Sequence, residues 1–315
     1  MTEIKAMATR DAYGKALAEL AAEKKDLIVM DADLSQSTKS AAFAKVCPER
    51  FFNAGIAEAN MIGVAAGMAA MGKTVFASSF AVFVTGRALD QIRNSVCYPR
   101  LNVKIAGSHA GLTVGEDGGT HQAIADIAVM RALPNMTVLV PSDAVCTNWL
   151  VKQAAEYDGP VYLRLGRLAA PIIYSEDTAF KWERGEIVRM GGDIVVFACG
   201  MMVATALEAA ELLAAEGISV AVADIHTIKP LDTDLILDMT ARCGAAMTLE
   251  EHSIIGGLGS AVAETLAGNS DAPFARCGIE DCFGQSGSPA ALLKHYGLDA
   301  ENVATRIKQV LAKKK

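Results

Sequence analysis

The chain has 315 residues, which is enough for about two domains of ordinary size, each with its own core. Hydrophobic residues make up 52% and aromatic residues only 6%, so aliphatic side chains must fill the interior, and a disordered or collagen-like chain is excluded. The formal net charge of −7 argues against a general nucleic-acid binder, because such a protein needs a basic surface.

Membrane and secretory features are not expected. No apolar stretch reaches the ~20 residues that a membrane span needs, and the first residues are too charged for a signal peptide. The seven cysteines are widely spaced and form no C-x-x-C pair, which is typical of reduced thiols in a cytoplasmic protein. We therefore expect a cytoplasmic protein without a metal site in its own chain.

The first half alternates between apolar runs of strand length and helix-length amphipathic segments. The expected strands are Leu27–Asp31, Thr74–Ser79, Val103–Gly107, Thr137–Val140 and Val161–Leu165. The expected helices are Arg10–Lys24, Ala57–Met71, Val84–Val96, Thr120–Ala132 and Ala144–Glu156. This alternation predicts a mainly parallel sheet covered on both faces, with ligands at the carboxyl ends of its strands.

Glu58 stands in the first turn of an otherwise nearly apolar helix. The ordinary interpretation is a carboxylate that stabilises the helix dipole. The functional interpretation is a carboxylate in dry surroundings, near Ile56, Met61 and Ile62, where burial raises its pKa.

Residues 67–74, Gly-Met-Ala-Ala-Met-Gly-Lys-Thr, match the phosphate-binding pattern G-x-x-x-x-G-K-[ST]. A P-loop follows a strand and opens a helix, so that free backbone N–H groups face the phosphates. Here the preceding segment is helical and a strand follows. We interpret Gly72 as a helix cap and keep a P-loop ATPase only as an alternative from another functional class.

The segment from Ser108 to Gln122 follows a predicted strand and carries two of the five histidines, together with Glu116, Asp117 and several glycines. Glycine and ionisable groups at the carboxyl end of a strand predict an active-site loop.

The second half contains another strand–helix series after a polar segment. Its expected strands are Ile194–Ala198, Ser219–Asp224 and Ala245–Leu249. Its expected helices are Met202–Glu216, Asp232–Ala241, one after Gly256–Gly259, Pro289–His295 and Ala300–Leu311. The fold class is therefore α/β, with two doubly wound domains of mainly parallel sheet. We place the domains at residues 1–170 and 191–315, with a linker at 171–190.

Several segments together resemble transketolase. They are Gly-Ile-Ala-Glu58-Ala-Asn, Gly-Glu-Asp117-Gly-Gly-Thr-His121-Gln, Asp31-Ala-Asp33-Leu34, Ser79-Phe80…Phe83 and Leu249-Glu-Glu-His-Ser-Ile-Ile-Gly-Gly-Leu-Gly. The resemblance is to the carboxyl-terminal half of that family, the pyrimidine-binding domain plus the C-terminal domain, and it covers essentially the whole chain.

The family's motif for the diphosphate tail of the cofactor is missing. Transketolases hold thiamine diphosphate through Mg²⁺ with a Gly-Asp-Gly motif and a later Asn, and no Gly-Asp-Gly occurs here. The resemblance therefore implies the C-terminal subunit of a split transketolase, whose N-terminal partner carries the diphosphate and Mg²⁺. The implied assembly is a dimer of heterodimers.

The resemblance also implies roles for individual residues. Glu58 would hydrogen-bond the aminopyrimidine ring, Phe80 and Phe83 would stack on it, and Asp33 would support the cofactor site. His121 would move protons at the oxygens of the donor and acceptor, and Asp117 would accept a hydrogen bond from a substrate hydroxyl.

The implied grip on a sugar phosphate comes from a further set of residues. They are Arg10, Ser37, His109 and Arg164. The last is ambiguous, because Arg164-Leu-Gly-Arg167 offers two candidates. Arginine is suited to such a site because its fork matches phosphate oxygens.

The implied activity is transfer of a two-carbon ketol unit from a ketose phosphate to an aldose phosphate, as in the pentose phosphate pathway. The nearest alternative is the beta subunit of a 2-oxo acid dehydrogenase E1 component, which shares the two-domain plan and also lacks the diphosphate motif. The Gly-Gly-Thr-His-Gln loop and the Asp-Ala-Asp-Leu-Ser segment argue against it. Deoxyxylulose phosphate synthesis and a non-catalytic assembly subunit are further alternatives.

Overall fold

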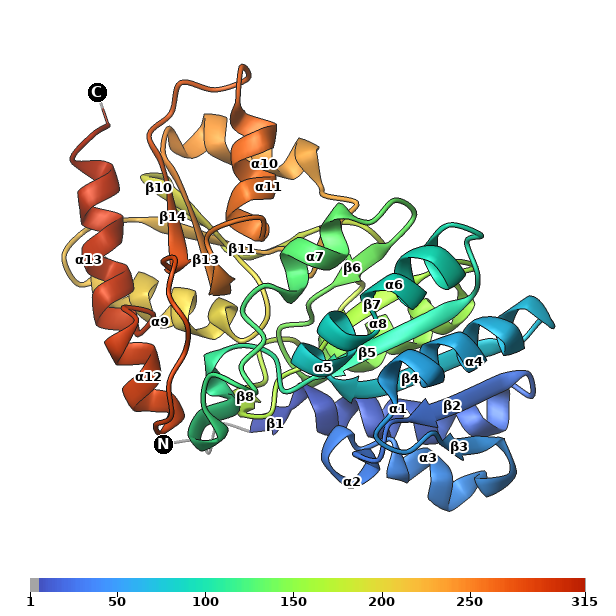
Figure 1. Cartoon of the computed structure of the whole chain (residues 1–315). Coiled ribbons are helices and arrows are strands. Elements are labelled where there is room, and N and C mark those ends of the chain that lie inside the picture. Colours follow the sequence, from blue (N-terminus) through green and yellow to red (C-terminus); the bar gives the residue numbers. More distant parts are fainter. Residues whose placement is uncertain (1–5, 315) are drawn as a thin grey trace.

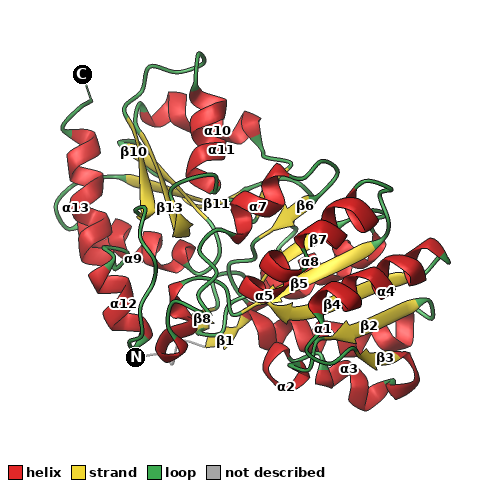
Figure 2. Ribbon diagram, in the orientation of Figure 1, coloured by secondary structure: helices red, strands yellow, loops and turns green. Residues whose placement is uncertain are grey.

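Besides a two-stranded sheet of Ala6–Ala8 and Ala169–Pro171, the strand–helix alternation of the sequence becomes two large sheets in the computed structural model, which describes residues 6–314 (Figure 1). Both sheets are mainly parallel and carry helices on both faces, so the expected α/β class is confirmed (Figure 2). Among the described residues no helix is both long enough and apolar enough to cross a bilayer.

The first sheet has seven strands in the order β12-β6-β7-β5-β4-β2-β3. They are β12 (Thr227–Lys229), β6 (Thr137–Leu139), β7 (Val161–Arg164), β5 (Val103–Ser108), β4 (Thr74–Phe80), β2 (Leu27–Asp31) and β3 (Phe51–Asn53). All neighbours are parallel except β12, which is antiparallel to β6 and comes from the second half of the chain.

Helices cover both faces of this sheet because their apolar sides face it. One face carries α1 (Thr9–Glu23), α3 (Ala41–Val46) and α8 (Ala144–Glu156). The other carries α4 (Glu58–Ala70), α5 (Ala81–Arg87) and α7 (Asp126–Ala132). Short elements complete the domain: β1 (Ala6–Ala8), α2 (Ser35–Thr38), η1 (Pro48–Arg50), α6 (Leu89–Gln91), η2 (Ile92–Cys97), η3 (Leu112–Asp117) and β8 (Ala169–Pro171).

The second sheet has five strands in the order β14-β13-β10-β11-β9. They are β14 (Phe274–Ile279), β13 (Ala246–Ser253), β10 (Ile194–Ala198), β11 (Val220–Asp224) and the antiparallel β9 (Glu186–Arg189). The helices that accompany it are α9 (Met202–Ala214), α10 (Thr233–Cys243), α11 (Leu258–Leu266), α12 (Pro289–His295) and α13 (Ala300–Leu311).

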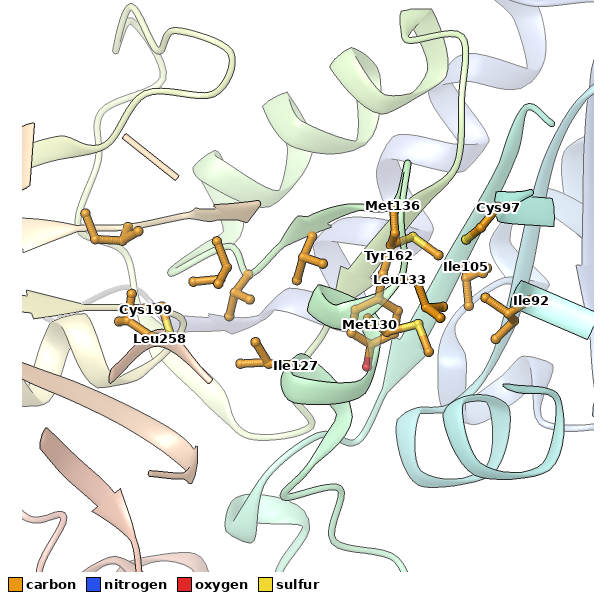
Figure 3. Packing of buried hydrophobic residues seen from close by; sticks show 14 of the residues in the cluster. Ile92, Cys97, Ile105, Ile127, Met130, Leu133, Met136, Tyr162, Cys199 and Leu258 are labelled. Carbon is orange, nitrogen blue, oxygen red and sulfur yellow. The ribbon is translucent and has the colours of Figure 1, made fainter. Parts of the chain in front are cut away.

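Buried apolar residues continue from one domain into the other. The largest cluster runs from Ile92, Ile105 and Met130 of the first domain to Cys199 and Leu258 of the second (Figure 3). The two domains therefore share a core instead of meeting across a polar gap.

Two expected helices differ from the structure. The segment expected as one helix over Val84–Val96 is divided into α5, α6 and the π-helical turn η2. The helix expected to begin at Thr120 begins at Asp126, and His121 lies in the preceding turn. Gly118, with φ +76°, and the adjacent Gly119 favour a turn over a helix there.

The P-loop interpretation of residues 67–74 is wrong. Gly67 lies inside α4, Gly72 ends the helix in the left-handed conformation, and β4 begins at Thr74. The order is helix then strand, so no helix begins at this glycine segment and the backbone cannot cradle a phosphate in the P-loop manner.

Candidate active site

The carboxyl edge of the first sheet gathers side chains from segments far apart in the sequence. Phe80 ends β4, Ser108 ends β5, and Glu58 begins the helix that follows β3. Because these strands are parallel, their carboxyl ends lie at one edge. The residues predicted from separate motifs therefore come together.

Glu58 is buried, with 3% of its surface exposed, at the first position of α4. Its Oε1 accepts a hydrogen bond of 2.9 Å from Nη1 of Arg87, whose side chain is 50% exposed at the end of α5. Met61 and Ile62 are buried, as expected, whereas Ile56 is 78% exposed. The carboxylate is thus shielded from water, as expected, but Ile56 does not cover it, and the fold places a guanidinium against it that the sequence does not predict.

Arg87 also covers an aromatic ring. Its guanidinium carbon lies 4.0 Å from the ring centroid of Phe83, four residues earlier on the same helix. The planar guanidinium thus has two contacts at once, a hydrogen bond to a buried carboxylate and a stack on a phenyl ring. A flat heterocycle with a ring nitrogen would make the same pair of contacts.

Aromatic rings extend the site from Phe83 toward β5. Phe80 and Phe83 stack with 5.6 Å between centroids, and Phe80 stacks on His109 at 3.9 Å. His121 meets the ring of Phe83 edge-on at 5.3 Å. The two phenylalanines and the two histidines therefore form one continuous aromatic surface.

His109 connects this surface to Arg10. Nη1 of Arg10 lies 3.0 Å from Nε2 of His109 and donates to the backbone oxygen of Ser37 at 3.0 Å. Burial, followed by the charge of Arg10, lowers the pKa of His109 to about 3. The imidazole is therefore neutral near pH 7, with Nε2 accepting from Arg10 and Nδ1–H directed to Oγ of Ser108, 2.8 Å away.

Arg10 has a donor to spare. Its Nε is buried and has no hydrogen-bond partner among the residues that the structure describes. Burial lowers the pKa of the guanidinium, which nevertheless stays charged at neutral pH. A buried, unpaired N–H on a cation is suited to an anionic oxygen.

Arg164 and Arg167 have different surroundings. Arg164 is buried, its Nε donates to Asp126 at 2.8 Å, and its Nη2 donates to the backbone oxygens of Ala123 and Glu251. It is therefore committed to the interior, and the expectation that it grips a substrate phosphate does not fit its position. Arg167 is 38% exposed and pairs with Asp117 at 3.0 Å. Burial lowers the pKa of both Arg10 and His109, and the positive charge of Arg167 lowers it further.

The remaining predicted residues lie at the same edge. Asp33, exposed and with φ +65°, accepts from Nδ2 of Asn53 at 3.0 Å, just before the segment that leads to Glu58. Ser37 offers its backbone oxygen to Arg10. Within residues 6–314, no group of three or more His, Cys, Asp or Glu side chains is arranged to hold a metal ion.

The sequence motifs do not point to Arg87, and they leave Arg167 as the second candidate beside Arg164. Arg87 carries one signal, its spacing of four residues from Phe83 on a helix. Arg167 was visible only as the second arginine of an ambiguous pair. In both cases burial and pairing decide the role, and these depend on the tertiary structure.

Comparison with known proteins agrees with this geometry. The family model described as "Transketolase, pyrimidine binding domain" matches residues 5–172, and "Transketolase, C-terminal domain" matches residues 183–303. A Methanocaldococcus jannaschii protein described as a transketolase C-terminal section is 50% identical over 96% of both chains. A 6-deoxy-6-sulfo-D-fructose transketolase subunit of Clostridium sp. is 43% identical, over 97% of this chain and 95% of the relative.

A solved structure is similar over the whole fold. "Split gene transketolase, inactive beta4 tetramer" has a TM-score of 0.90 and 51% identity, covering 99% of this chain and 100% of that one. Human transketolase is 39% identical over 98% of this chain, but the matched region is only 49% of the human protein.

Proposed function

The chain belongs to the transketolase family, and from that premise we propose that it is the C-terminal subunit of a split, thiamine-diphosphate-dependent transketolase. An N-terminal partner subunit would carry the domain that holds the diphosphate and Mg²⁺, in a dimer of heterodimers. The half-length match to human transketolase and the full-length match to a split-gene transketolase structure support this arrangement.

The proposed reaction is transfer of a two-carbon ketol unit from a ketose phosphate to an aldose phosphate. One observation carries the proposal: an unbroken series of contacts from Glu58 through Arg87, Phe83, His121, Phe80 and His109 to Arg10. The series joins a carboxylate and aromatic surface, suited to an aminopyrimidine, to a cationic end, suited to a sugar phosphate.

The residues at the ring end fit the pyrimidine of thiamine diphosphate. The Glu58 carboxyl, when protonated, would donate its O–H to a ring nitrogen, and Phe83 would offer a face for stacking, once Arg87 leaves both contacts. When bound, the cofactor supplies the nucleophilic carbon that accepts the ketol unit. The role of this chain is to orient the ring and to keep the Glu58 carboxyl away from bulk water.

The residues at the other end act on the substrate. Arg10, with its unpaired Nε, and Arg167 donate to the phosphate, so we propose Arg167 in the place expected of Arg164. His109, held neutral, accepts from Arg10 at Nε2 and so positions that guanidinium for the phosphate. His121 moves a proton at a substrate oxygen, and Asp117 accepts from a substrate hydroxyl.

Relatives of similar length act on different anionic sugars. Their names give 6-deoxy-6-sulfo-D-fructose for the Clostridium protein and apulose 4-phosphate for a subunit from Phocaeicola vulgatus that is 38% identical over 94% of this chain. The shared feature is a negative group on a sugar, which the two arginines of this site match.

The test is reconstitution. The chain is co-purified with its N-terminal partner, supplied with thiamine diphosphate and Mg²⁺, and assayed for ketol transfer and for 2-oxo acid decarboxylation. Ketol transfer that needs both chains supports the proposal. Decarboxylation without ketol transfer would favour the E1 beta subunit, and transfer by this chain alone would overturn the division of the site.

A further inference from the structure

The substrate loop, defined as residues 111–122, is held by the second domain at two places. It contains η3 and carries Asp117 and His121, the two side chains proposed to act on substrate. The second domain contacts it through Glu251 on β13 and through the segment that leads into α12, which packs against η3 (Figure 1).

Glu251 holds the beginning of the loop. The side chain is buried, and its carboxylate accepts from the backbone N–H of Thr113 and, at 3.2 Å, from the hydroxyl of the same residue. Gly111, with φ +82°, leaves room for it, since a Cβ there would stand 2.5 Å from Oε1 of Glu251. The loop and the carboxylate are therefore fitted closely to each other.

The backbone of Glu251 is fixed independently. Its carbonyl oxygen accepts at 2.9 Å from Nη2 of Arg164, whose own charge is paired with the buried Asp126. Burial raises the pKa of the Glu251 carboxyl to about 7, against the opposing charge of Arg164 and the hydrogen bonds from Thr113. Burying an acid costs free energy, and the two hydrogen bonds from Thr113 offset part of that cost.

Gln122 holds the end of the loop. Its Nε2 donates to the backbone oxygen of Leu112 at 3.1 Å and to that of Gln285 in the second domain at 3.0 Å. Gly284 makes the approach of that segment feasible, because a Cβ there would collide with the amide of Gln122. The loop is closed on itself and anchored at both ends.

We propose that Glu251 is a positioning residue, through which the second domain fixes Asp117 of the substrate loop for recognition of a substrate hydroxyl. The role of Asp117 rests on the proposed function, whereas the hold of Glu251 on the loop rests on the contacts above. The second domain then contributes to substrate discrimination as well as to assembly.

The neighbouring Glu250 provides a matched control. It is also buried on β13, but its carboxylate accepts from the backbone N–H groups of Leu258 and Gly259, at 2.8 and 2.7 Å, at the start of α11. It therefore stabilises the second domain without touching the substrate loop. A Glu250 variant should therefore loosen the start of α11, whereas only a Glu251 variant should release the substrate loop.

The experiment compares Glu251→Ala, Glu251→Gln and Glu250→Ala in the full chain by hydrogen exchange. Glu251→Ala should raise exchange across residues 111–122 by about tenfold, because a buried N–H loses its acceptor. Glu251→Gln, which keeps an acceptor oxygen, should stay near wild type, and Glu250→Ala should raise exchange at the start of α11 only. Unaltered loop exchange in Glu251→Ala, or equal loop exchange in Glu250→Ala, would overturn the proposal.

Steady-state kinetics of the reconstituted complex distinguish positioning of Asp117 from a general loss of stability, which would not change the KM for the acceptor or the discrimination between acceptors. Glu251→Ala should raise the KM for the acceptor about tenfold with kcat nearly unaltered. The contact of Asp117 with the hydroxyl is made equally in ground and transition states, and Gln122 still anchors the end of the loop that carries His121. Glu251→Ala should also lose discrimination against an acceptor that lacks the hydroxyl. A fall in kcat at constant KM, or unaltered discrimination, would overturn the role assigned to Asp117 positioning.

A substitute variant and a measurement that does not need activity keep the proposal testable. If Glu251→Ala does not fold, Thr113→Val removes the hydroxyl contact from the other side and should raise loop exchange and KM by about threefold. If the wild-type complex shows no ketol transfer, the proposed function fails, while hydrogen exchange on the chain still decides whether Glu251 holds the loop.

Discussion

Arg164 and Arg167 are three positions apart, and replacing each by methionine should separate stability from binding. Arg164 is 7% exposed and serves as the charge partner of Asp126, which is 0% exposed in its side chain. Arg167 is 38% exposed and pairs with an equally open Asp117. The two arginines therefore have the same chemistry in opposite environments.

The expected magnitudes follow from those environments. Arg164→Met leaves a buried carboxylate with only the Tyr162 hydroxyl, at 2.7 Å, as donor. It also removes the arginine donor from the backbone oxygens of Glu251 and Ala123, of which Ala123 keeps the N–H of Gly111. Breaking one side of a buried ion pair costs about 3–5 kcal/mol of unfolding free energy, a large fraction of the ~5–15 kcal/mol of a typical protein. Arg167→Met removes an exposed pair worth about 0–1 kcal/mol.

Binding should show the reverse order. A charge-assisted hydrogen bond to phosphate contributes about 1.5–3 kcal/mol, so Arg167→Met should lower kcat/KM for a phosphorylated sugar by roughly tenfold to a hundredfold. Urea unfolding followed by circular dichroism measures the first effect, and steady-state kinetics of the reconstituted complex measure the second. Wild-type stability in Arg164→Met, or wild-type kcat/KM in Arg167→Met, would refute the assignment of the two arginines.

Three further predictions concern single residues. Glu58→Ala should abolish turnover while gel filtration still shows the complex with the partner, and a near-normal rate would remove Glu58 from its role. Arg87→Ala frees Glu58 and the face of Phe83, so it should lower the Kd of the complex for thiamine diphosphate by about twofold to fivefold in a fluorescence titration, whereas a higher Kd would contradict the competition. Burial raises the pKa of Asp224 to about 7, so the folded state keeps a proton that the unfolded chain releases near pH 4. The contribution of Asp224 to stability should therefore be complete below about pH 4 and be lost as pH rises from about 4 to 7. Urea unfolding of Asp224→Asn should show a smaller fall over that range.

The sequence predicts which strands and helices carry the site residues, but not which side chains pair with one another. Glu58, Phe80 and His109 were placed at strand ends or helix starts by apolar periodicity alone, and the carboxyl ends of parallel strands meet at one edge of the sheet. Their convergence therefore follows from secondary structure and topology. Each strand or helix is recognised from residues that are neighbours in the sequence, so apolar periodicity is sufficient to locate its ends.

Pairing partners depend on tertiary packing that periodicity does not encode. Arg87 meets Glu58 across 29 positions, and Arg164 meets Asp126 across 38. Arg164 is the last residue of β7 and Arg167 lies three residues beyond it, and this local difference alone does not show which of the two is buried. Which arginine is buried becomes clear only in the folded structure, where Asp126 of α7 and the backbone of Glu251 in β13 contact Arg164.

The contacts of Arg164 join the two domains at the edge of the first sheet where we propose that substrate binds. One guanidinium pairs with Asp126 of the first domain and binds the backbone of Glu251 in the second, and Glu251 in turn binds the substrate loop through Thr113. Each of these groups is buried, so none can exchange its partner for water without a large cost in free energy. A loop rich in glycine would otherwise sample many conformations. Buried groups from both domains, Asp126 on α7, Arg164 on β7 and Glu251 on β13, hold its first part in place. If the loop binds substrate as we propose, recognition of the substrate depends on the packing of the two domains against each other.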